Sequence, residues 1–374
     1  MNTSAQPIAK KSNRLFSIDA LRGFDMLLIS GGGAFIVLLN GKTSWHWVDV
    51  LAQQLKHPAW NGFTFYDFIF PLFLFIAGVS IPFSLNKGLA TGLSKQYLYR
   101  KAFRRMIVLI ILGIIDKNTP ITFFEPSNIR LGTVLGRIGV AGFAAALLYL
   151  NFSLVKRLWW VAGILIFYYA ALFLIPVPGY GAGDLSFEGN LVGWIDRHFL
   201  PGRLVQKTYD ENGLLTQLPA LCLTVLGSIA GDILQSDKKE RKKIQLLILA
   251  GVAGIALGLV WGLHFPINKH LWSSSFILLT AGMAFLSLAL FYQVIDVWKI
   301  RKWAFFFHVI GMNSLTIYLV YRFVPFAQIS KRIFSGLYAP LPEDFQPALD
   351  AFGGLILVWL VMYFLYRKKI FIKI

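Results

Sequence analysis

The chain has 374 residues, of which 56% are hydrophobic, 16% aromatic and only 14% charged. This composition excludes an ordinary soluble globular protein, because one core could not hide so many apolar side chains. The net charge of +18 would suggest nucleic-acid binding in a soluble domain, but the basic residues lie mainly in loops between apolar runs. The sequence therefore predicts an all-α, polytopic integral membrane protein that does not bind nucleic acid.

About 10 (10–11) transmembrane helices are expected, because about 20 apolar residues cross a bilayer. The span at 106–116 is the shortest, so it must begin among the basic residues before it or lie tilted. Most Lys and Arg fall in alternate connections, and the positive-inside rule then places both termini in the cytoplasm. The predicted spans are 18–40, 65–85, 106–116, 131–150, 158–176, 218–235, 244–263, 272–292, 304–325 and 349–367.

The chain is predicted to be a single transmembrane domain, 1–374, without a cleaved signal peptide. Residues 1–17 lack an apolar run and form a cytoplasmic tail. Residues 177–217 are too polar to span and form a large outer loop, long enough to be functional. Acidic side chains outnumber basic ones in this loop, which would favour a cationic substrate; a merely solvated loop is the alternative.

The run HPAWNGFTFYDFIFP leads into the second span and carries His57, Asn61 and Asp67. A titratable ring at a membrane face is a candidate for acid-base or nucleophilic work near pH 7. Asn40 ends the first span on the same outer face. Thr64 and Asp67 have the spacing of a capping box, which gives Asp67 a structural alternative.

Arg137 lies inside the fourth span and needs a partner there, because an unpaired charge in hydrocarbon is costly. Asp67 is at comparable depth. We therefore predict an Asp67–Arg137 ion pair.

Three charged residues of the first span, Asp19, Arg22 and Asp25, follow one another at intervals of three and predict an ion-pair ladder on one helix face. A polar mouth for an anionic cytoplasmic ligand is the alternative. The glycine run at 31–33 permits a close backbone approach or a cavity. In the ninth span, Asn313 and Ser314 predict hydrogen bonds between helices, with a ligand pocket as the second interpretation.

The outer turn HFPINKHLWSSSF places Asn268, Lys269, His270 and Trp272 on the face that carries His57. Trp272 is expected to be an interfacial anchor and Lys269 to extend toward the interface. The alternative is that this turn lines the same vestibule as His57. No CxxC, HExxH or carboxylate cluster predicts a metal site, and no GxxxxGK[ST] predicts a nucleotide-driven pump.

Several segments together resemble the transmembrane acyltransferases related to heparan-alpha-glucosaminide N-acetyltransferase, over nearly the whole chain and in the same order. They are RLFSIDALRGFDM, the glycine run, HPAWNGFTFYDFIFPLFLFIAG, RHFLPGRL, DENGLLTQLPA, PINKHLWSSSF and GMNSLTIYL. In this resemblance His57 matches the histidine assigned as catalytic, and Asn40 matches an asparagine beside it. The loop DENGLLTQLPA departs from bacterial relatives, which often have a proline and a serine there.

The resemblance implies that an acetyl group passes from cytoplasmic acetyl-CoA, the co-substrate, to the amine of a glucosamine-type sugar or glycan on the outer side. His57, Asn40 and Asp67 are then the candidate catalytic residues, with His57 as acetyl carrier or as general base. The compact chain suggests a multi-pass protein of a bacterial cytoplasmic (inner) membrane, and a homodimer is left open. The candidate acetyl-CoA-binding residues are Asp19, Arg22, Asp25, Arg137, Asn313 and Ser314, and the candidate acceptor-binding residues are Asn61, Asn268, Lys269 and Trp272.

Two other functions remain compatible with the sequence. A multispan sugar or ion transporter would use the same polar residues without covalent chemistry, although the polar groups gather at the outer ends of spans. An O-acyltransferase of a surface glycan would keep the chemistry and change the acceptor to a hydroxyl.

Overall fold

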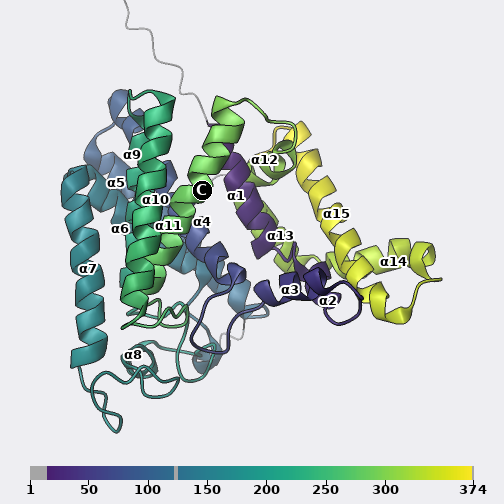
Figure 1. Cartoon of the computed structure of the whole chain (residues 1–374), viewed down its shortest axis with the longest axis horizontal. Helices are drawn as coiled ribbons and strands as arrows, with labels where there is room; N and C mark the ends of the chain where they lie inside the picture. Colours follow the sequence, from purple (N-terminus) through teal and green to yellow (C-terminus); the bar gives the residue numbers. More distant parts are fainter. Residues whose placement is uncertain (1–14, 122–124, 373–374) are drawn as a thin grey trace, which may run out of the picture.

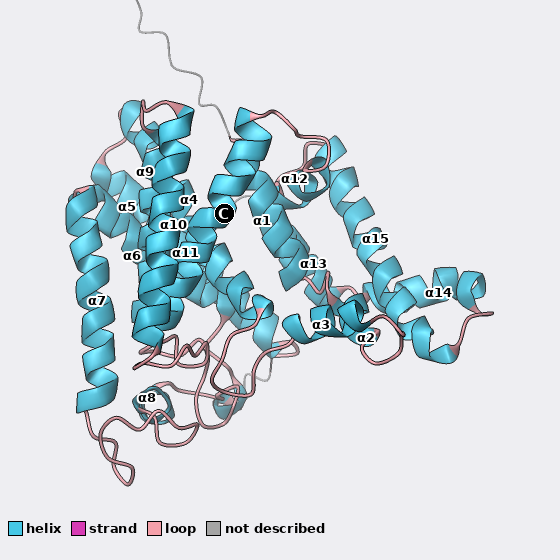
Figure 2. Ribbon diagram, in the orientation of Figure 1, coloured by secondary structure: helices cyan, strands magenta, loops and turns pink. Residues whose placement is uncertain are grey.

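A computed structural model describes residues 15–121 and 125–372, and its regular elements are all helical (Figures 1 and 2). The prediction of an all-α fold is thus confirmed, while most of the predicted tail, 1–17, lies outside the described residues. The longer helices are α1 (Phe16–Ile29), α4 (Phe65–Ala90), α5 (Lys95–Asn118), α6 (Val134–Asn151), α7 (Leu154–Leu174), α9 (Gln217–Gln235), α10 (Glu240–Gly262), α11 (Ser274–Phe291) and α15 (Gln346–Arg367). The shorter ones are α2 (Ala34–Leu38), α3 (His46–Gln54), α8 (Leu191–Phe199), α12 (Phe305–Gly311), α13 (Ser314–Phe323) and α14 (Phe326–Tyr338).

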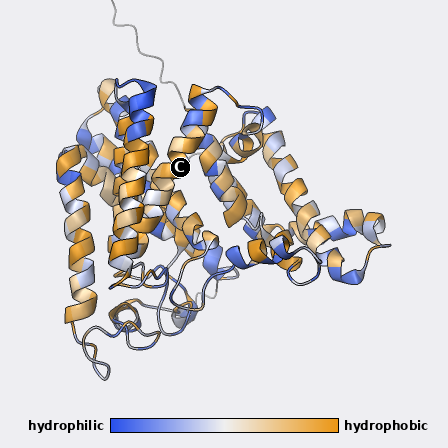
Figure 3. Cartoon of the chain, in the orientation of Figure 1, coloured by the Kyte–Doolittle hydropathy of each residue, from blue (hydrophilic) through white to orange (hydrophobic). Residues whose placement is uncertain are grey.

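Eight segments of the described chain are long and apolar enough to cross a membrane, so the protein is multi-pass, but the predicted count of about ten is not confirmed. They are Phe16–Leu38, Phe65–Ala90, Val134–Asn151, Leu154–Leu174, Gln217–Gln235, Glu240–Gly262, Ser274–Val297 and Glu343–Arg367. The predicted span 106–116 falls within α5, whose first half is basic. The predicted span 304–325 is interrupted between α12 and α13. Figure 3 shows the upright helices as largely apolar.

Helix α4 is the centre of the bundle and packs most closely against α9. A Cβ atom on Gly78 would lie 2.0 Å from the backbone oxygen of Thr224, and one on Gly227 would lie 2.0 Å from that of Phe75. Only glycine permits such an approach, which is how small residues hold membrane helices together. The close contact fixes α4 as a rigid support for the residues at its first turn.

The first span is broken at its glycine run. Helix α1 ends at Ile29, and Gly31 adopts φ +80°, a conformation that favours glycine. A Cβ atom on Gly31 would also lie 2.6 Å from the hydroxyl oxygen of Tyr321. The glycine run thus admits the close approach of a side chain from α13, and the chain continues as the short helices α2 and α3.

Three connections meet at the end of the bundle where α4 begins, which we call the outer end. They are the segment 55–64, the turn 263–273 and the loop 177–217 that contains α8 (Figures 1 and 2). The loop is anchored rather than merely solvated: Val192 of α8 is buried in one cluster with Tyr168, Phe265 and Leu271. Segments distant in sequence thus surround the start of α4.

Candidate active site

The imidazole of His57 lies directly against the first turn of α4. Its Nδ1 atom is 2.6 Å from Oδ1 of Asp67, which is completely buried. The other carboxylate oxygen of Asp67 accepts a hydrogen bond from the backbone N–H of Thr64 at 3.0 Å and completes a capping box. The predicted capping box is confirmed, and the same carboxylate also holds His57.

Lys269 completes the group around His57. Its Nζ atom is 2.9 Å from Nε2 of His57 and 3.7 Å from Oδ1 of Asp67. Burial lowers the pKa of Lys269, and the carboxylates of Glu211 and Asp67 oppose that shift. The ring of Tyr66 lies 4.9 Å from the imidazole, centre to centre, and 36% of the His57 side chain remains exposed. His57 is therefore held from the protein side and open toward the outer end.

The arrangement determines which nitrogen of His57 can react. An ionised carboxylate only accepts hydrogen bonds, so Nδ1 carries the proton that faces Asp67. The lone pair is then on Nε2, beside Lys269. A histidine held in this tautomer can act at Nε2 as a base or as a nucleophile.

The outer turn 263–273 contributes further polar groups beside His57. The amide of Asn268 donates to Oδ1 of Asn61 at 2.9 Å and accepts from the backbone N–H of Leu271 at 2.8 Å. The structure thus brings Asn61, Asn268 and Lys269 together with His57. Trp272, however, is 1% exposed, and its prediction as an interfacial anchor is wrong because its ring packs beneath Arg137.

Arg137 packs against the buried Trp272 and does not pair with Asp67. Its guanidinium lies 4.3 Å from the centre of the Trp272 ring and donates to the hydroxyl of Thr216. Because Asp67 is held by His57 and Lys269, the predicted Asp67–Arg137 pair is wrong. Two further nitrogens of Arg137 have no hydrogen-bond partner among the described residues.

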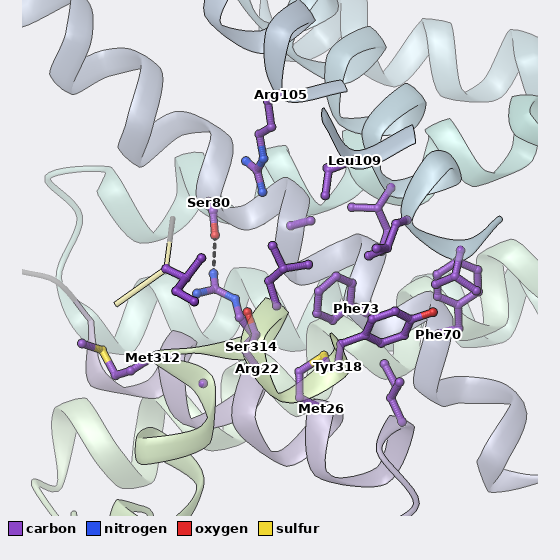
Figure 4. Close-up of a pocket in the computed structure, with 18 residues that line it drawn as sticks. Arg22, Met26, Phe70, Phe73, Ser80, Arg105, Leu109, Met312, Ser314 and Tyr318 are labelled. Carbon is purple, nitrogen blue, oxygen red and sulfur yellow. Dashed lines mark hydrogen bonds between the residues drawn. The ribbon is translucent and has the colours of Figure 1, made fainter. Parts of the chain in front are cut away.

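A cavity of about 320 Å³ lies between α1, α4, α5, α6, α12 and α13 (Figure 4). One end is polar: Arg22 donates to Ser80 at 2.7 Å, and Arg105 of α5 lines the same region. Its remaining walls are mainly apolar. They include Met26, Ile29, Phe70, Phe73, Ala77, Leu109, Val134, Leu135, Ile138, Leu315 and Tyr318.

The opposite end of the cavity approaches His57 along α4. The α4 residues that line it run from Ser80 to Phe70, about 15 Å along the helix at 1.5 Å per residue. This is about half of the 30 Å thickness of a bilayer core. Phe70 lies three residues after Asp67, on the same side of α4 and about 4.5 Å further along it. The cavity therefore extends from a basic end, at Arg22 and Arg105, to within one helical turn of the His57 site.

The six candidate acetyl-CoA-binding residues do not all lie at the cavity. Arg22 and Ser314 line the cavity, and Asp19 lies 3.3 Å from the Arg22 guanidinium. Asp25 is fully buried, and neither carboxylate oxygen has a hydrogen-bond partner among the described residues, so the predicted three-member ladder is wrong at this position.

Two of the six residues serve other contacts. Arg137 packs at the outer end, as described above. The amide of Asn313 donates to the backbone oxygen of Ile370 and accepts from the N–H of Ile372, so it holds the segment after α15 against the bundle. Ile372 itself lines the cavity.

Asn40 follows α2. Among the described residues, the hydrogen-bond and ring contacts given above for the His57 side chain are made by Asp67, Lys269 and Tyr66 and not by Asn40. Sequence reasoning did not assign Ser80 and Arg105 to the cavity. For Arg105, the sequence did offer an indication: this residue is one of the basic residues directly before the shortest predicted span, 106–116, which is expected to begin among them or to lie tilted. No group of three His, Cys, Asp or Glu side chains within the described ranges is arranged as metal ligands are.

The outer loop is tied to the site by buried carboxylates. Asp210 forms a bidentate pair with Arg130, with both contacts at 2.8 Å. Asp196 of α8 accepts the backbone N–H groups of Asp210 and Leu214 at 3.1 and 2.9 Å. Burial raises the pKa of Asp196 to about 6. These contacts fix residues 209–214, and the hydroxyl of Tyr209 lies 2.7 Å from Nδ1 of His270 in the turn that carries Lys269.

Comparison with known proteins agrees with the resemblance predicted from the sequence. Residues 14–120 match a domain of unknown function (DUF5009). The chain is 30% identical to the heparan-alpha-glucosaminide N-acetyltransferase of Homo sapiens across 96% of this chain and 60% of that protein. It is 30% identical to the protein of the same name of Mus musculus across 100% of this chain and 63% of that protein. The chain therefore spans about 60% of the length of these relatives, and the predicted relationship is confirmed.

Proposed function

We propose that this relative of the heparan-alpha-glucosaminide N-acetyltransferases transfers acetyl from cytoplasmic acetyl-CoA to the amine of a glucosamine-type sugar at the outer end of the bundle. The supporting observation is the cavity that leads from Arg22 and Arg105 to within one turn of the His57–Asp67–Lys269 group. We place the protein, as one transmembrane domain with both termini in the cytoplasm, in a bacterial inner membrane.

The cavity has the chemistry that an acyl-CoA requires. Its basic end, with Arg22 and Arg105, suits the phosphates of the donor, because guanidinium groups bind phosphate in charge-assisted hydrogen bonds. The apolar walls along the rest of the cavity suit the narrow arm of the donor that carries the acyl group. The thioester then lies near Phe70, at the end of the cavity beside the first turn of α4.

His57 can serve this transfer in two ways. As a general base, Nε2 takes the proton from the acceptor amine while the nitrogen attacks the thioester carbon, the C–S bond breaks and the CoA thiolate leaves. As a nucleophile, Nε2 attacks the thioester carbon first and releases the thiolate. The amine then attacks the acetyl carbon, the bond between that carbon and Nε2 breaks, and the freed imidazole takes the proton of the amine. In both routes Asp67 orients the ring and stabilises its positive form, and Lys269 must yield Nε2 to the reacting group.

The test is transfer of radiolabelled acetyl from acetyl-CoA to glucosamine by the purified protein in detergent. We expect transfer by the parent and its loss in His57→Ala, with an unchanged thermal melt. His264→Ala is the matched control, because this histidine lies in the same outer turn but packs against Phe173 and Tyr169. The absence of transfer to any amino sugar or glycan hydroxyl, together with no stabilisation by CoA, would refute the proposal and favour a transporter.

The two routes are separated by omitting the acceptor. Acetyl label on His57, located by mass spectrometry after incubation with acetyl-CoA alone, would establish the covalent route. Initial rates that require both substrates before CoA is released, with no label on the protein, would establish the general-base route.

A further inference from the structure

A second cluster of side chains lies beside His57, where the outer loop meets the turn that carries Lys269. We call it the Glu211 subsite and define it as Trp60, Tyr209, Glu211 and His270. The ring of Trp60 stacks on that of His270, with centres 5.3 Å apart and planes 8° apart. The Tyr209 hydroxyl is 2.7 Å from Nδ1 of His270, and Oε1 of Glu211 is 3.3 Å from the same nitrogen.

The chain itself connects this cluster to His57. Trp60 follows His57 by three residues, and His270 is the residue after Lys269, whose Nζ contacts the His57 ring. The Asn61–Asn268 hydrogen bond at 2.9 Å holds these two segments together. The indole N–H of Trp60 donates to the backbone oxygen of Leu185 at 3.0 Å, so the outer loop fixes the ring. The Glu211 subsite is thus a rigid extension of the His57 site.

Glu211 keeps hydrogen-bonding capacity in this cluster. The nearer partner of the His270 Nδ1 atom is the Tyr209 hydroxyl, and one ring nitrogen makes one strong hydrogen bond. A carboxylate offers about four acceptor sites, and 29% of the Glu211 side chain is exposed. Burial opposes ionisation, but His270, Lys269 and His57 lower the pKa of Glu211 to about 2. The carboxylate is therefore negatively charged at neutral pH and reachable from the outer end.

We propose that the Glu211 subsite binds the protonated amino sugar acceptor, with the Glu211 carboxylate receiving its ammonium group, and so selects amino sugars over neutral sugars. Before the nitrogen attacks, the ammonium loses one proton to solvent at this partly exposed site, and its second proton goes to Nε2 of His57 as the amide forms. An ammonium group and a carboxylate form a charge-assisted hydrogen bond, about twice as strong as a neutral one. The inference rests on the proposed function only for the identity of the acceptor.

The test compares Glu211→Gln with the parent in two independent measurements. The first is stabilisation of the detergent-purified protein by glucosamine, with glucose as the neutral comparator and no acetyl-CoA present. The second is acetyl transfer, with KM for glucosamine, KM for acetyl-CoA and kcat determined separately. We expect glucosamine to bind about ten- to a hundredfold more weakly to Glu211→Gln, with KM for acetyl-CoA unchanged.

Two further variants control for charge and folding. Glu343→Gln removes the same charge from an exposed position in the short helix Glu343–Phe345 that precedes α15 and should behave as the parent does. Glu211→Asp keeps the charge on a shorter side chain and should restore part of the affinity. Glucosamine affinity in a folded Glu211→Gln protein within twofold of the parent would overturn the subsite, even if transfer occurs. A third outcome separates the two proposals. If the parent protein transfers no acetyl but is stabilised by glucosamine, and the Glu211→Gln protein is not, the subsite stands and the proposed function fails.

Discussion

Replacement of Asp67 by asparagine should separate the two roles of this carboxylate, which are to cap α4 and to hold His57. The side-chain oxygen of asparagine can still accept the backbone N–H of Thr64, now at 3.0 Å, so the first turn of α4 should remain capped. The charge that faces Nδ1 of His57 at 2.6 Å is lost. We therefore expect a folded protein that transfers acetyl slowly.

The magnitude follows from the charge that His57 gains during the reaction. Two unit charges about 4 Å apart interact by about 4 kcal/mol at an effective dielectric constant of about 20. Because 36% of the His57 side chain is exposed, water screens part of this interaction. A loss of about 3 to 4 kcal/mol corresponds to a decrease in kcat of about 10²- to 10³-fold.

The assay is kcat for acetyl transfer at saturating substrates, together with the thermal melt of each variant. Thr64→Ala is the matched control, because it removes the other half of the capping box. It should cost about 1 kcal/mol of stability and leave kcat close to that of the parent. A kcat of Asp67→Asn within threefold of the parent would refute a catalytic role for this carboxylate, and so would an equal loss of kcat in Thr64→Ala.

Two other predictions concern the cavity and the outer loop. Ala77→Phe should fill the middle of the cavity and lower kcat/KM for acetyl-CoA at least about tenfold. Ala256→Phe, on an exposed face of α10, is the control and should leave kcat/KM unchanged. Equal kcat/KM values in the two variants would contradict a donor path through the cavity. The folded protein retains the proton of Asp196 up to about pH 6, whereas the unfolded chain releases it near pH 4. The protonated carboxyl therefore contributes to the free energy of unfolding below pH 4. That contribution, about 3 kcal/mol, is lost as the pH rises from about 4 to about 6. Melting between pH 4 and 7 should show this slope in the parent and not in Asp196→Asn; an unchanged slope would contradict the role of Asp196.

Much of the architecture could be predicted because it depends on local sequence. The capping box at Thr64 and Asp67 is set by residues three apart, and the close approach at Gly31 follows from the absence of a side chain. The interruption between α12 and α13 could not be read from hydropathy, because an apolar run looks the same whether or not its helix continues.

Composition and hydropathy by themselves determined that the chain is an all-helical, multi-pass protein, because an apolar run of span length must bury its backbone polar groups in a helix. The sequence also determined the relationship to a family and the choice of His57 as the central residue. Only the tertiary structure decided the partners: Asp67 holds His57, Arg137 packs on Trp272, and Glu211 meets His270. Such pairs join residues far apart in the chain, so they depend on how the helices and outer connections pack, which the spacing of residues along one helix does not specify.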